Sequence, residues 1–241
     1  MGFYKSVADY YHYMFPINRR QIEFLYKNYP RSNELDLLDI GCGTGALGYE
    51  LAKEFNTVTG IDIDDVMLEK AKSKNPPDNL TFIKMDMLDI SKNFEPNSKD
   101  IITCFGNTLV HLESPKAILK FFKQCKGILK EDGKLIIQII NYERILDQNI
   151  SSLATIQNPE IKFERNYNYN KSKNIIDFNT TLTIKETGEE IKNSIPIYPL
   201  RRKEITPLIS RAGFTGIRYY GNFRGDPLLL EESIPLLFET F

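Results

Sequence analysis

The sequence predicts an α/β fold in which a doubly wound, mostly parallel sheet carries an inserted antiparallel β unit. Between residues 35 and 140, short apolar runs alternate with amphipathic segments, as in consecutive βαβ units. A glycine cluster at residues 41–45 joins the first apolar run to the next amphipathic segment. After residue 141 the alternation stops, and three β-like runs follow without a helix between them. These observations favour one α/β core interrupted by a β insertion.

The first half of the chain is expected to supply the parallel strands and their crossover helices. Apolar residues at helical spacing predict helices, and short apolar runs predict buried strands. Asp64 can cap one helix, and Ser114 followed by Pro115 has the chemistry of a helix start. The expected helices span residues 3–29, 46–55, 64–72 and 114–129, and the expected strands span residues 35–40, 57–61, 80–85, 100–104 and 134–140.

The second half is expected to hold the insertion and the end of the core sheet. Residues 161–170, 174–185 and 189–198 read as three antiparallel strands, with a turn signal at Thr187-Gly188. A helix is expected from Arg201 to Ala212, stopped by Gly213, and Pro207 predicts a kink or a late start within it. Two final strands are expected over residues 214–220 and 234–241.

Composition excludes several classes of function. The 241 residues carry a formal net charge of −1, so no whole-chain charge favours nucleic acid or an anionic membrane. No apolar run reaches the roughly 18 residues of a membrane span, and the N-terminus does not resemble a signal peptide. The chain has two histidines and three cysteines without a C-x-x-C pair. We therefore expect a cytoplasmic protein. We expect it neither to associate with a membrane nor to bind nucleic acid, and we expect no metal site.

The glycine cluster is the most informative segment. Glycines at a strand-to-helix turn let a ligand lie against the backbone, and the N–H groups at the helix start face that ligand. Asp62 ends the next predicted strand, where its carboxylate can accept hydrogen bonds from ribose hydroxyls. The spacing of Gly41, Gly43 and Ala46 also satisfies the dinucleotide fingerprint, so an NAD-dependent oxidoreductase stays open on these residues alone.

The run LLDIGCGTG, Leu37 to Gly45, resembles motif I of the class I S-adenosylmethionine (AdoMet)-dependent methyltransferases. Further segments at family-like spacing extend this similarity over most of residues 35–141 and again from about residue 198 to 241; they are Val58–Ile63, Phe82–Met87, Asp100–Phe105, Leu129–Gly133 and Ala212–Phe214. The resemblance implies a Rossmann-like sheet of seven strands with the last one antiparallel, which agrees with the number of predicted strands.

The resemblance also implies roles for individual residues in binding AdoMet. The glycine loop, Gly41 to Gly45, would line the methionine part, and Asp62 would bind the ribose diol. Ile63 would cover the adenine ring, and Asp86 would accept a hydrogen bond from its amino group. The implied cofactor-binding residues are Tyr11, Gly41, Cys42, Gly43, Gly45, Asp62, Ile63, Asp86, Met87 and Phe105. The expected product is S-adenosylhomocysteine.

The segment after the fourth strand, Cys104 to Leu112, bears on the methyl acceptor. It lacks the [DNS]-P-P-[YFW] motif of enzymes that methylate bases, and GNTLVHL resembles glycine N-methyltransferase and related small-molecule enzymes. We therefore expect transfer to a nitrogen or oxygen of a small molecule by direct in-line displacement. No catalytic residue is assigned, but His111 could act as a base for a hydroxyl acceptor. Candidate acceptor contacts are Asn107, His111, Tyr142, Tyr198 and Arg201.

The expected organisation has three parts. Residues 1–34 form an N-terminal helical lid, residues 35–145 and 199–241 form the AdoMet-binding core, and residues 146–198 form an inserted antiparallel β lid. Besides the oxidoreductase, two alternatives remain at this point: an RNA or protein methyltransferase, for which Arg19, Arg20, Arg201 and Arg202 would have to form one basic face, and a non-catalytic AdoMet-binding module.

Overall fold

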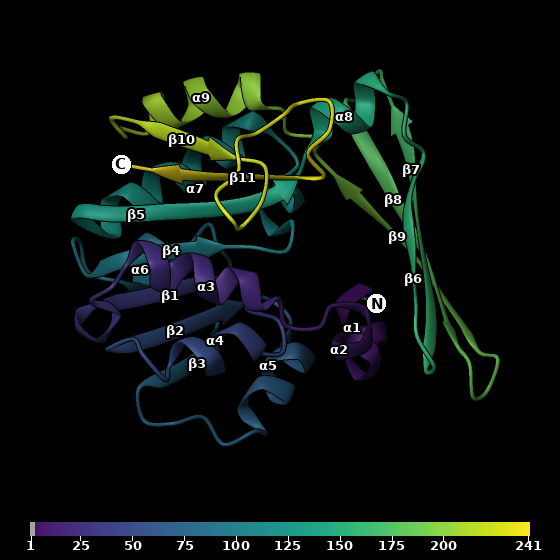
Figure 1. The fold of residues 1–241 in the computed structure, drawn as a ribbon, viewed down its shortest axis with the longest axis horizontal. Coiled ribbons are helices and arrows are strands. Elements are labelled where there is room, and N and C mark those ends of the chain that lie inside the picture. Colours follow the sequence, from purple (N-terminus) through teal and green to yellow (C-terminus); the bar gives the residue numbers. More distant parts are fainter. Residues whose placement is uncertain (1–2) are drawn as a thin grey trace.

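The computed structural model describes residues 3–241 and contains a seven-stranded core sheet. Its strands are β1 (Asp36–Ile40), β2 (Thr57–Asp62), β3 (Leu80–Lys84), β4 (Lys99–Cys104), β5 (Leu129–Ile140), β10 (Ile217–Tyr220) and β11 (Pro235–Thr240). They lie in the order β10-β11-β5-β4-β1-β2-β3 (Figure 1). β11 is antiparallel to both of its neighbours, and the pairs among β1 to β5 are parallel. The predicted seven-stranded sheet with an antiparallel last strand is therefore confirmed.

Helices cover both faces of this sheet. On one face lie α3 (Arg19–Asn28), α4 (Ala46–Leu51) and α5 (Asp65–Lys72), which share an apolar cluster with alternate strand residues such as Leu37 and Val58. On the other face α6 (Ile90–Asn93), α7 (Pro115–Ile128) and α9 (Arg202–Arg211) pack with strand residues of opposite parity, such as Leu38 and Ile61. The strands are apolar on both faces because both faces are buried.

Local chemistry fixes the helix starts. The Asp64 side chain accepts hydrogen bonds from the backbone N–H groups of Val66 and Met67, and the Ser114 side chain accepts from Ala117, as the sequence predicts. α9 begins at Arg202 and continues through Pro207, so the alternative of a late start is wrong.

The N-terminal segment is broken where the sequence predicts one helix over residues 3–29. It forms α1 (Phe3–Val7), a 3-10 turn (Ala8–Tyr10), α2 (Tyr11–Met14) and, after a gap, α3. The break follows from Pro16, which disfavours helical backbone at the residue before it, and from Asn18, whose side chain caps α3 by accepting from Arg20 N–H.

A second, antiparallel sheet follows the short helix α8 (Tyr142–Asp147). It contains β6 (Ser152–Gln157), β7 (Ile161–Asn170), β8 (Ile175–Ile184) and β9 (Glu190–Ile197), in that order. The sequence predicts the last three of these strands; β6 was missed because Ser152, Ala154 and Thr155 leave it without a clear apolar alternation. In Figure 1 this sheet stands beside one end of the core strands, with α1 and α2 between the two sheets.

A third apolar cluster joins α1 and α2 to the second sheet. Val7 and Met14 pack with Ile161, Phe163 and Leu182, and all five are fully buried or nearly so. Within the described residues, no helix is both long and apolar enough to cross a membrane.

Candidate functional site

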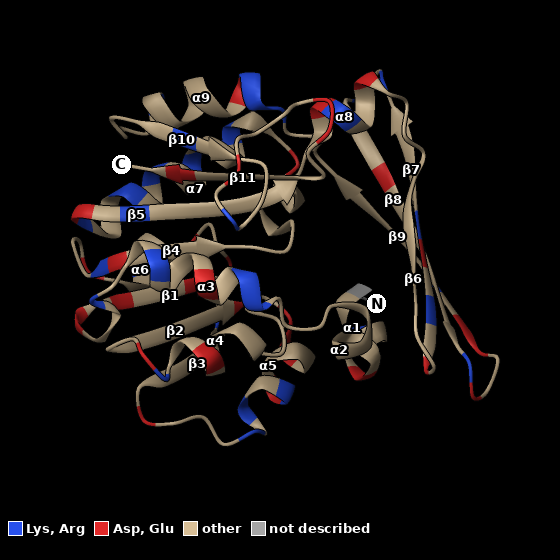
Figure 2. Ribbon diagram, viewed as in Figure 1, with Lys and Arg blue, Asp and Glu red and all other residues tan. Residues whose placement is uncertain are grey.

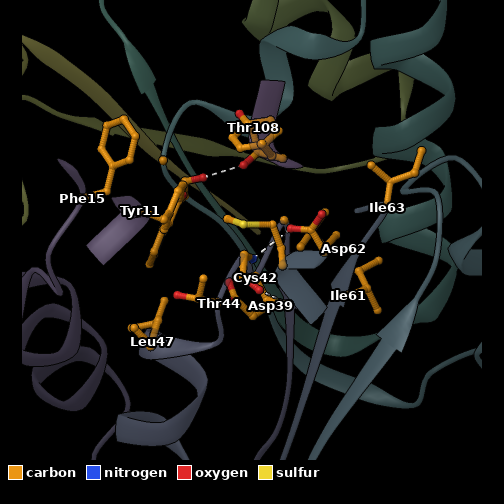
Figure 3. Close-up of a pocket in the computed structure, with 18 of the residues that line it drawn as sticks. Tyr11, Phe15, Asp39, Cys42, Thr44, Leu47, Ile61, Asp62, Ile63 and Thr108 are labelled. Carbon is orange, nitrogen blue, oxygen red and sulfur yellow. Dashed lines mark hydrogen bonds between the residues drawn. The ribbon is translucent and has the colours of Figure 1, made fainter. Parts of the chain in front are cut away.

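The carboxyl ends of the central core strands open into a cavity of about 660 Å³. Its floor comes from the loops after β1, β2, β3 and β4, and its cover comes from the N-terminal segment. In Figure 3, Tyr11 and Phe15 of that segment lie across the pocket from Asp62 and Ile63. This position is where open parallel sheets bind their ligands.

The glycine loop after β1 is held by its own backbone. Gly41 and Cys42 donate their N–H groups to the Ile61 carbonyl at 2.8 and 3.0 Å, and Gly45 N–H donates to the Cys42 carbonyl at 3.0 Å. Gly41, Gly43 and Gly45 have φ angles of +73°, +54° and +75°, which side chains rarely adopt. The loop therefore requires glycine for conformation as well as for space.

The three glycines differ in what surrounds them. A Cβ at Gly41 would lie 2.5 Å from Thr108, and one at Gly45 would lie 2.4 Å from Phe82. At Gly43 the nearest atoms, from Tyr11 and Met67, would be 3.5 Å away. Gly41 and Gly45 are thus required by internal packing, whereas Gly43 has a bare backbone that lines the cavity.

Asp62 links the glycine loop to the end of β2. One carboxylate oxygen accepts the Gly43 N–H at 2.8 Å, and the other accepts the Asp64 N–H at 3.0 Å. Burial raises the pKa of Asp62, and these two backbone donors oppose the rise. The carboxylate lines the cavity and keeps lone pairs there that can accept hydrogen bonds from a vicinal diol.

Asp39 lies beneath the loop and is 3% exposed. It accepts the Thr103 hydroxyl at 2.8 Å, and its burial raises its pKa to about 7. The nearby Asp62 carboxylate adds to the rise because two negative charges disfavour each other.

Residues beyond Asp62 form the side of the cavity where the sequence places an adenine ring. Ile63 is 64% exposed although it is large and apolar, so it has free surface to cover a flat ring. Asp86 uses one oxygen to accept the Leu88 N–H at 2.8 Å, and Met87 follows it along the lining. A partly apolar wall with a carboxylate at its edge fits a purine with an exocyclic amino group.

The end of β4 lines the opposite side. Phe105 is buried against Phe223 with ring centroids 5.1 Å apart, and His111 follows on a 3-10 turn, η3 (Thr108–His111). His111 Nε2 and the Tyr4 hydroxyl are 2.9 Å apart. Burial lowers the pKa of His111, which favours a neutral imidazole near pH 7.

The structure brings most of the predicted cofactor residues to one cavity. The lining includes Tyr11, Gly41, Cys42, Gly43, Asp62, Ile63, Asp86, Met87 and Phe105. Gly45 lies behind this surface, against Phe82. His111 is the one predicted acceptor contact that lines the cavity.

Four predicted acceptor contacts lie outside the cavity lining. Asn107 donates to the Tyr142 hydroxyl at 2.9 Å and accepts the Ile140 N–H at 2.9 Å. The Tyr198 hydroxyl donates to Glu204, and Arg201 forms a 3.2 Å ion pair with Asp147. These contacts hold loops together. Asn107, Tyr142, Tyr198 and Arg201 do not line the cavity, and their role as acceptor contacts stays a prediction.

Several lining residues were missed by sequence reasoning. Tyr4, Gln21, Thr44, Met67 and Thr108 all line the cavity. Tyr4 belongs to the tyrosine-rich start of the chain, which could have indicated it. Thr44 lies within the glycine loop, whose motif could have indicated it. Gln21, Met67 and Thr108 carry no local signal, because only the packing of α3, α5 and η3 brings them to the site.

Comparison with known proteins finds similarity to methyltransferases. A family described as "Methyltransferase domain" matches residues 37–133. A glycine/sarcosine N-methyltransferase of Aphanothece halophytica is 26% identical over 206 residues, covering 84% of this chain and 74% of that protein. A ubiquinone biosynthesis O-methyltransferase of Glaesserella parasuis is 34% identical over 110 residues, covering 44% of this chain and 45% of that protein. The chain spans about half the length of several curated relatives that it matches.

The fold is shared with solved structures over nearly the whole chain. A crystal structure of an S-adenosylmethionine-dependent methyltransferase from Clostridium acetobutylicum aligns with a TM-score of 0.81 at 17% identity, covering 99% of this chain and 98% of that one. The N-terminal helices and the second sheet therefore belong to the shared architecture.

Proposed function

We propose that this chain is a class I S-adenosylmethionine-dependent methyltransferase, as its similarity to a methyltransferase family and to methyltransferase relatives supports. In this proposal it transfers a methyl group to a nitrogen or oxygen of a small-molecule acceptor. One observation carries the proposal. The bare backbone of Gly43, the Asp62 carboxylate and the end of β4 line the same cavity. A single ligand can therefore contact the loop, the carboxylate and Phe105 together.

The residues of the cavity suit AdoMet part by part. In this proposal Asp62 holds the ribose diol, Ile63 and Met87 cover the adenine, and Asp86 accepts from its amino group. The glycine loop, Gly41 to Gly45, lies along the methionine part, and Tyr11 covers it from the N-terminal segment. When bound, the cofactor supplies a methyl group that its sulfonium already activates.

The protein's own task in this reaction is alignment and exclusion of water. Phe105 presents an apolar surface at the end of β4, and Tyr4, Tyr11 and Phe15 close the cavity from above. Holding a nucleophile in line with the methyl carbon and the sulfur can supply roughly 7–11 kcal/mol of the barrier reduction. A neutral amine acceptor needs no base, whereas a hydroxyl acceptor could use the neutral imidazole of His111.

A small acceptor is favoured over RNA or protein. The cavity lies between the core sheet and the N-terminal cover. One relative is named for the methylation of glycine and sarcosine, and another is named for ubiquinone biosynthesis. The four arginines that a basic face would need are divided: Arg19 and Arg20 begin α3, whereas Arg201 and Arg202 lie at the start of α9 (Figure 2). Basic and acidic segments are interspersed in that view.

Calorimetric titration with AdoMet, S-adenosylhomocysteine and, separately, NADH tests this function. We expect micromolar binding of the first two ligands and none of NADH. The Asp62→Ala variant should bind AdoMet at least tenfold more weakly, because the diol loses its acceptor, while Asp65→Ala, an exposed neighbour on α5, should bind normally. A protein that binds NADH and not AdoMet would contradict the proposal. A screen of small amines, amino acids and phenols for methylated product then identifies the acceptor.

A further inference from the structure

A single basic side chain lines the cavity of the proposed cofactor site. Among the lining residues that the structure describes, Lys74 is the one Lys or Arg. Three carboxyl groups line the same cavity, those of Asp39, Asp62 and Asp86. Ionised carboxyl groups repel a carboxylate of a ligand, whereas the Lys74 ammonium attracts it. The position of this ammonium therefore bears on how the anionic part of a ligand is oriented.

The chain around Lys74 has a defined local conformation. Lys74 follows the last turn of α5, and the next residue, Asn75, turns the chain with a φ of +53°. Asparagine adopts this left-handed conformation more readily than most residues. The Asn75 N–H donates to the Lys72 carbonyl at 3.2 Å, and Pro76 and Pro77 restrict the backbone that follows. The backbone of Lys74 is thus held between a helix end and a restricted turn.

Packing brings this end of α5 against the glycine loop. A Cβ at Gly45 would lie 3.0 Å from the Ala71 Cβ, and the Tyr49 hydroxyl of α4 donates to the Ala71 carbonyl at 2.8 Å. Lys74 Nζ lies 5.8 Å from the centre of the Tyr49 ring. Nζ donates a hydrogen bond to the Thr44 carbonyl at 3.1 Å. The ammonium is therefore bonded to the backbone of the glycine loop itself.

The Lys74 ammonium has capacity for an anion. An ammonium carries three N–H donors, and the hydrogen bond to Thr44 uses one of them. None of the ion pairs found between residues 3 and 241 includes Lys74. Partial burial and, to a smaller extent, the nearby Lys70 lower the pKa of Lys74, and an anion beside it would oppose that shift. A ligand in the cavity can therefore supply the counter-ion.

Thr44 lies away from the side of the cavity where the adenine is proposed to bind. In Figure 3, Thr44 lies on one side of Cys42, and Ile63 lies on the other. In the cofactor orientation proposed above, the adenine lies at Ile63 and the ribose at Asp62. The methionine part then runs along the glycine loop toward Thr44. Its terminal carboxylate comes to the residue whose carbonyl accepts the hydrogen bond of Lys74.

We propose that Lys74 forms an ion pair with the α-carboxylate of the cofactor, an inference that rests on the methyltransferase function proposed above. Lys74 fixes one end of the methionine part, while Asp62 fixes the ribose. Arg19 and Arg20 of α3 are exposed and do not belong to the described lining of the cavity, so Lys74 is assigned this role rather than either arginine. The ion pair makes Lys74 a determinant of specificity for ligands that carry an amino-acid carboxylate.

Two ligands that differ by one carboxylate test this assignment. S-adenosylhomocysteine and its decarboxylated counterpart, S-adenosyl-3-thiopropylamine, are titrated calorimetrically into the wild type and its variants. We expect the wild type to bind S-adenosylhomocysteine more tightly by about tenfold or more. Lys74→Gln should remove this preference by weakening S-adenosylhomocysteine alone, and Lys74→Arg, which keeps the charge, should retain part of it. Lys53→Gln, which removes an exposed ammonium just after α4, should change neither affinity.

The decarboxylated ligand separates a binding role from a structural one. If Lys74 only supported the glycine loop through Thr44, Lys74→Gln would weaken both ligands equally, and that result would overturn the inference. Unchanged binding of S-adenosylhomocysteine by Lys74→Gln, or loss of the preference in Arg20→Gln instead, would overturn it as well. A wild type that does not bind S-adenosylhomocysteine overturns the proposed function, whereas a wild type that binds both ligands equally overturns only the assignment of Lys74.

Discussion

The glycines in the loop after β1 have different structural roles. Gly45 has a left-handed backbone and no room for a Cβ beside Phe82, whereas Gly43 has ordinary van der Waals space around it. A sequence motif shows all three glycines as equivalent. The structure separates those that the fold needs from the one that faces a ligand.

The first prediction tests this separation by substitution with alanine. Gly45→Ala should lower the free energy of unfolding by at least about 2 kcal/mol, because alanine is strained at this φ and its Cβ meets Phe82. Gly43→Ala should cost only about 1–2 kcal/mol but weaken AdoMet binding tenfold or more. Urea unfolding and calorimetry measure the two effects. Gly127→Ala in α7, where a Cβ meets nothing within 4 Å, is the control and should not destabilise. Equal stability losses in the two loop variants would contradict the separation.

The second prediction concerns pH and Asp39. Its pKa rises from 3.8 to about 7 in the folded protein, so between these values the folded state holds a proton that the unfolded chain has lost. Stability attributable to this proton is present below about pH 4 and is lost as pH rises to about 7. Relative to Asp39→Asn, the wild type should therefore lose up to about 4 kcal/mol across this window. Urea unfolding of both proteins from pH 4 to 8 checks this, and parallel stability curves would show that Asp39 is ionised throughout.

At the scale of elements, the N-terminal segment behaves as a cover with its own anchor. α1 and α2 contribute Val7 and Met14 to a cluster with β7 and β8, and they line the cavity through Tyr4 and Tyr11. The exposed ion pair between Asp9 and Lys70 adds a surface link to α5. Such pairs contribute little, so the apolar anchor decides whether the cover stays closed.

The third prediction follows from this anchor. Met14→Ala should leave a cavity that costs about 2–5 kcal/mol, and because the segment lies at the edge of the fold, the loss should appear as local opening. Amide hydrogen exchange in residues 4–14 should accelerate, and S-adenosylhomocysteine affinity should fall severalfold. Lys5→Ala, an exposed site on α1, should change neither. Faster exchange throughout the core sheet would instead mean that α2 stabilises the whole molecule.

Elements also show where sequence reasoning succeeds and fails. The parallel strands are apolar on both faces, and the positions of β1 to β4 were predicted within a residue. β5 begins at Leu129, five residues before its predicted start. The prediction of a single helix over residues 3–29 was wrong, because it relied on apolar spacing and did not take Pro16 into account. β6 was missed because an edge strand exposed on most of its length needs no apolar alternation.

At the scale of the whole molecule, the two sheets share one core. Tyr167, Ile176 and Ile197 of the second sheet belong to the same buried cluster as the helices and strands of the core. The inserted sheet is therefore expected to unfold together with the rest of the chain in one cooperative transition.

The fourth prediction uses stabilisation by a ligand to test whether the two sheets unfold together. S-adenosylhomocysteine at 100 times its Kd should stabilise the folded state by about 2.7 kcal/mol, which corresponds to a rise in Tm of about 5–11 °C for a chain of this size. The shift should be the same by near-UV circular dichroism and by hydrogen exchange of the second sheet. NADH at the same concentration serves as the control and should leave Tm unchanged. Two separate transitions would show that the second sheet folds on its own.

The sequence by itself determined the core sheet, its glycine loop and the positions of Asp62 and Asp86, because apolar patterning and turn chemistry are local properties of the chain. The side chains that complete the site come from distant segments, so only the tertiary structure decided them. Tyr4 reaches His111 across 107 positions, and Asn107 and Tyr142 turn out to hold a loop rather than line the cavity. In the second sheet, Arg165 lies beside Thr180, and Thr180 beside Asn193, only because of strand register. Register and packing bring together residues whose separation along the chain leaves no local signal.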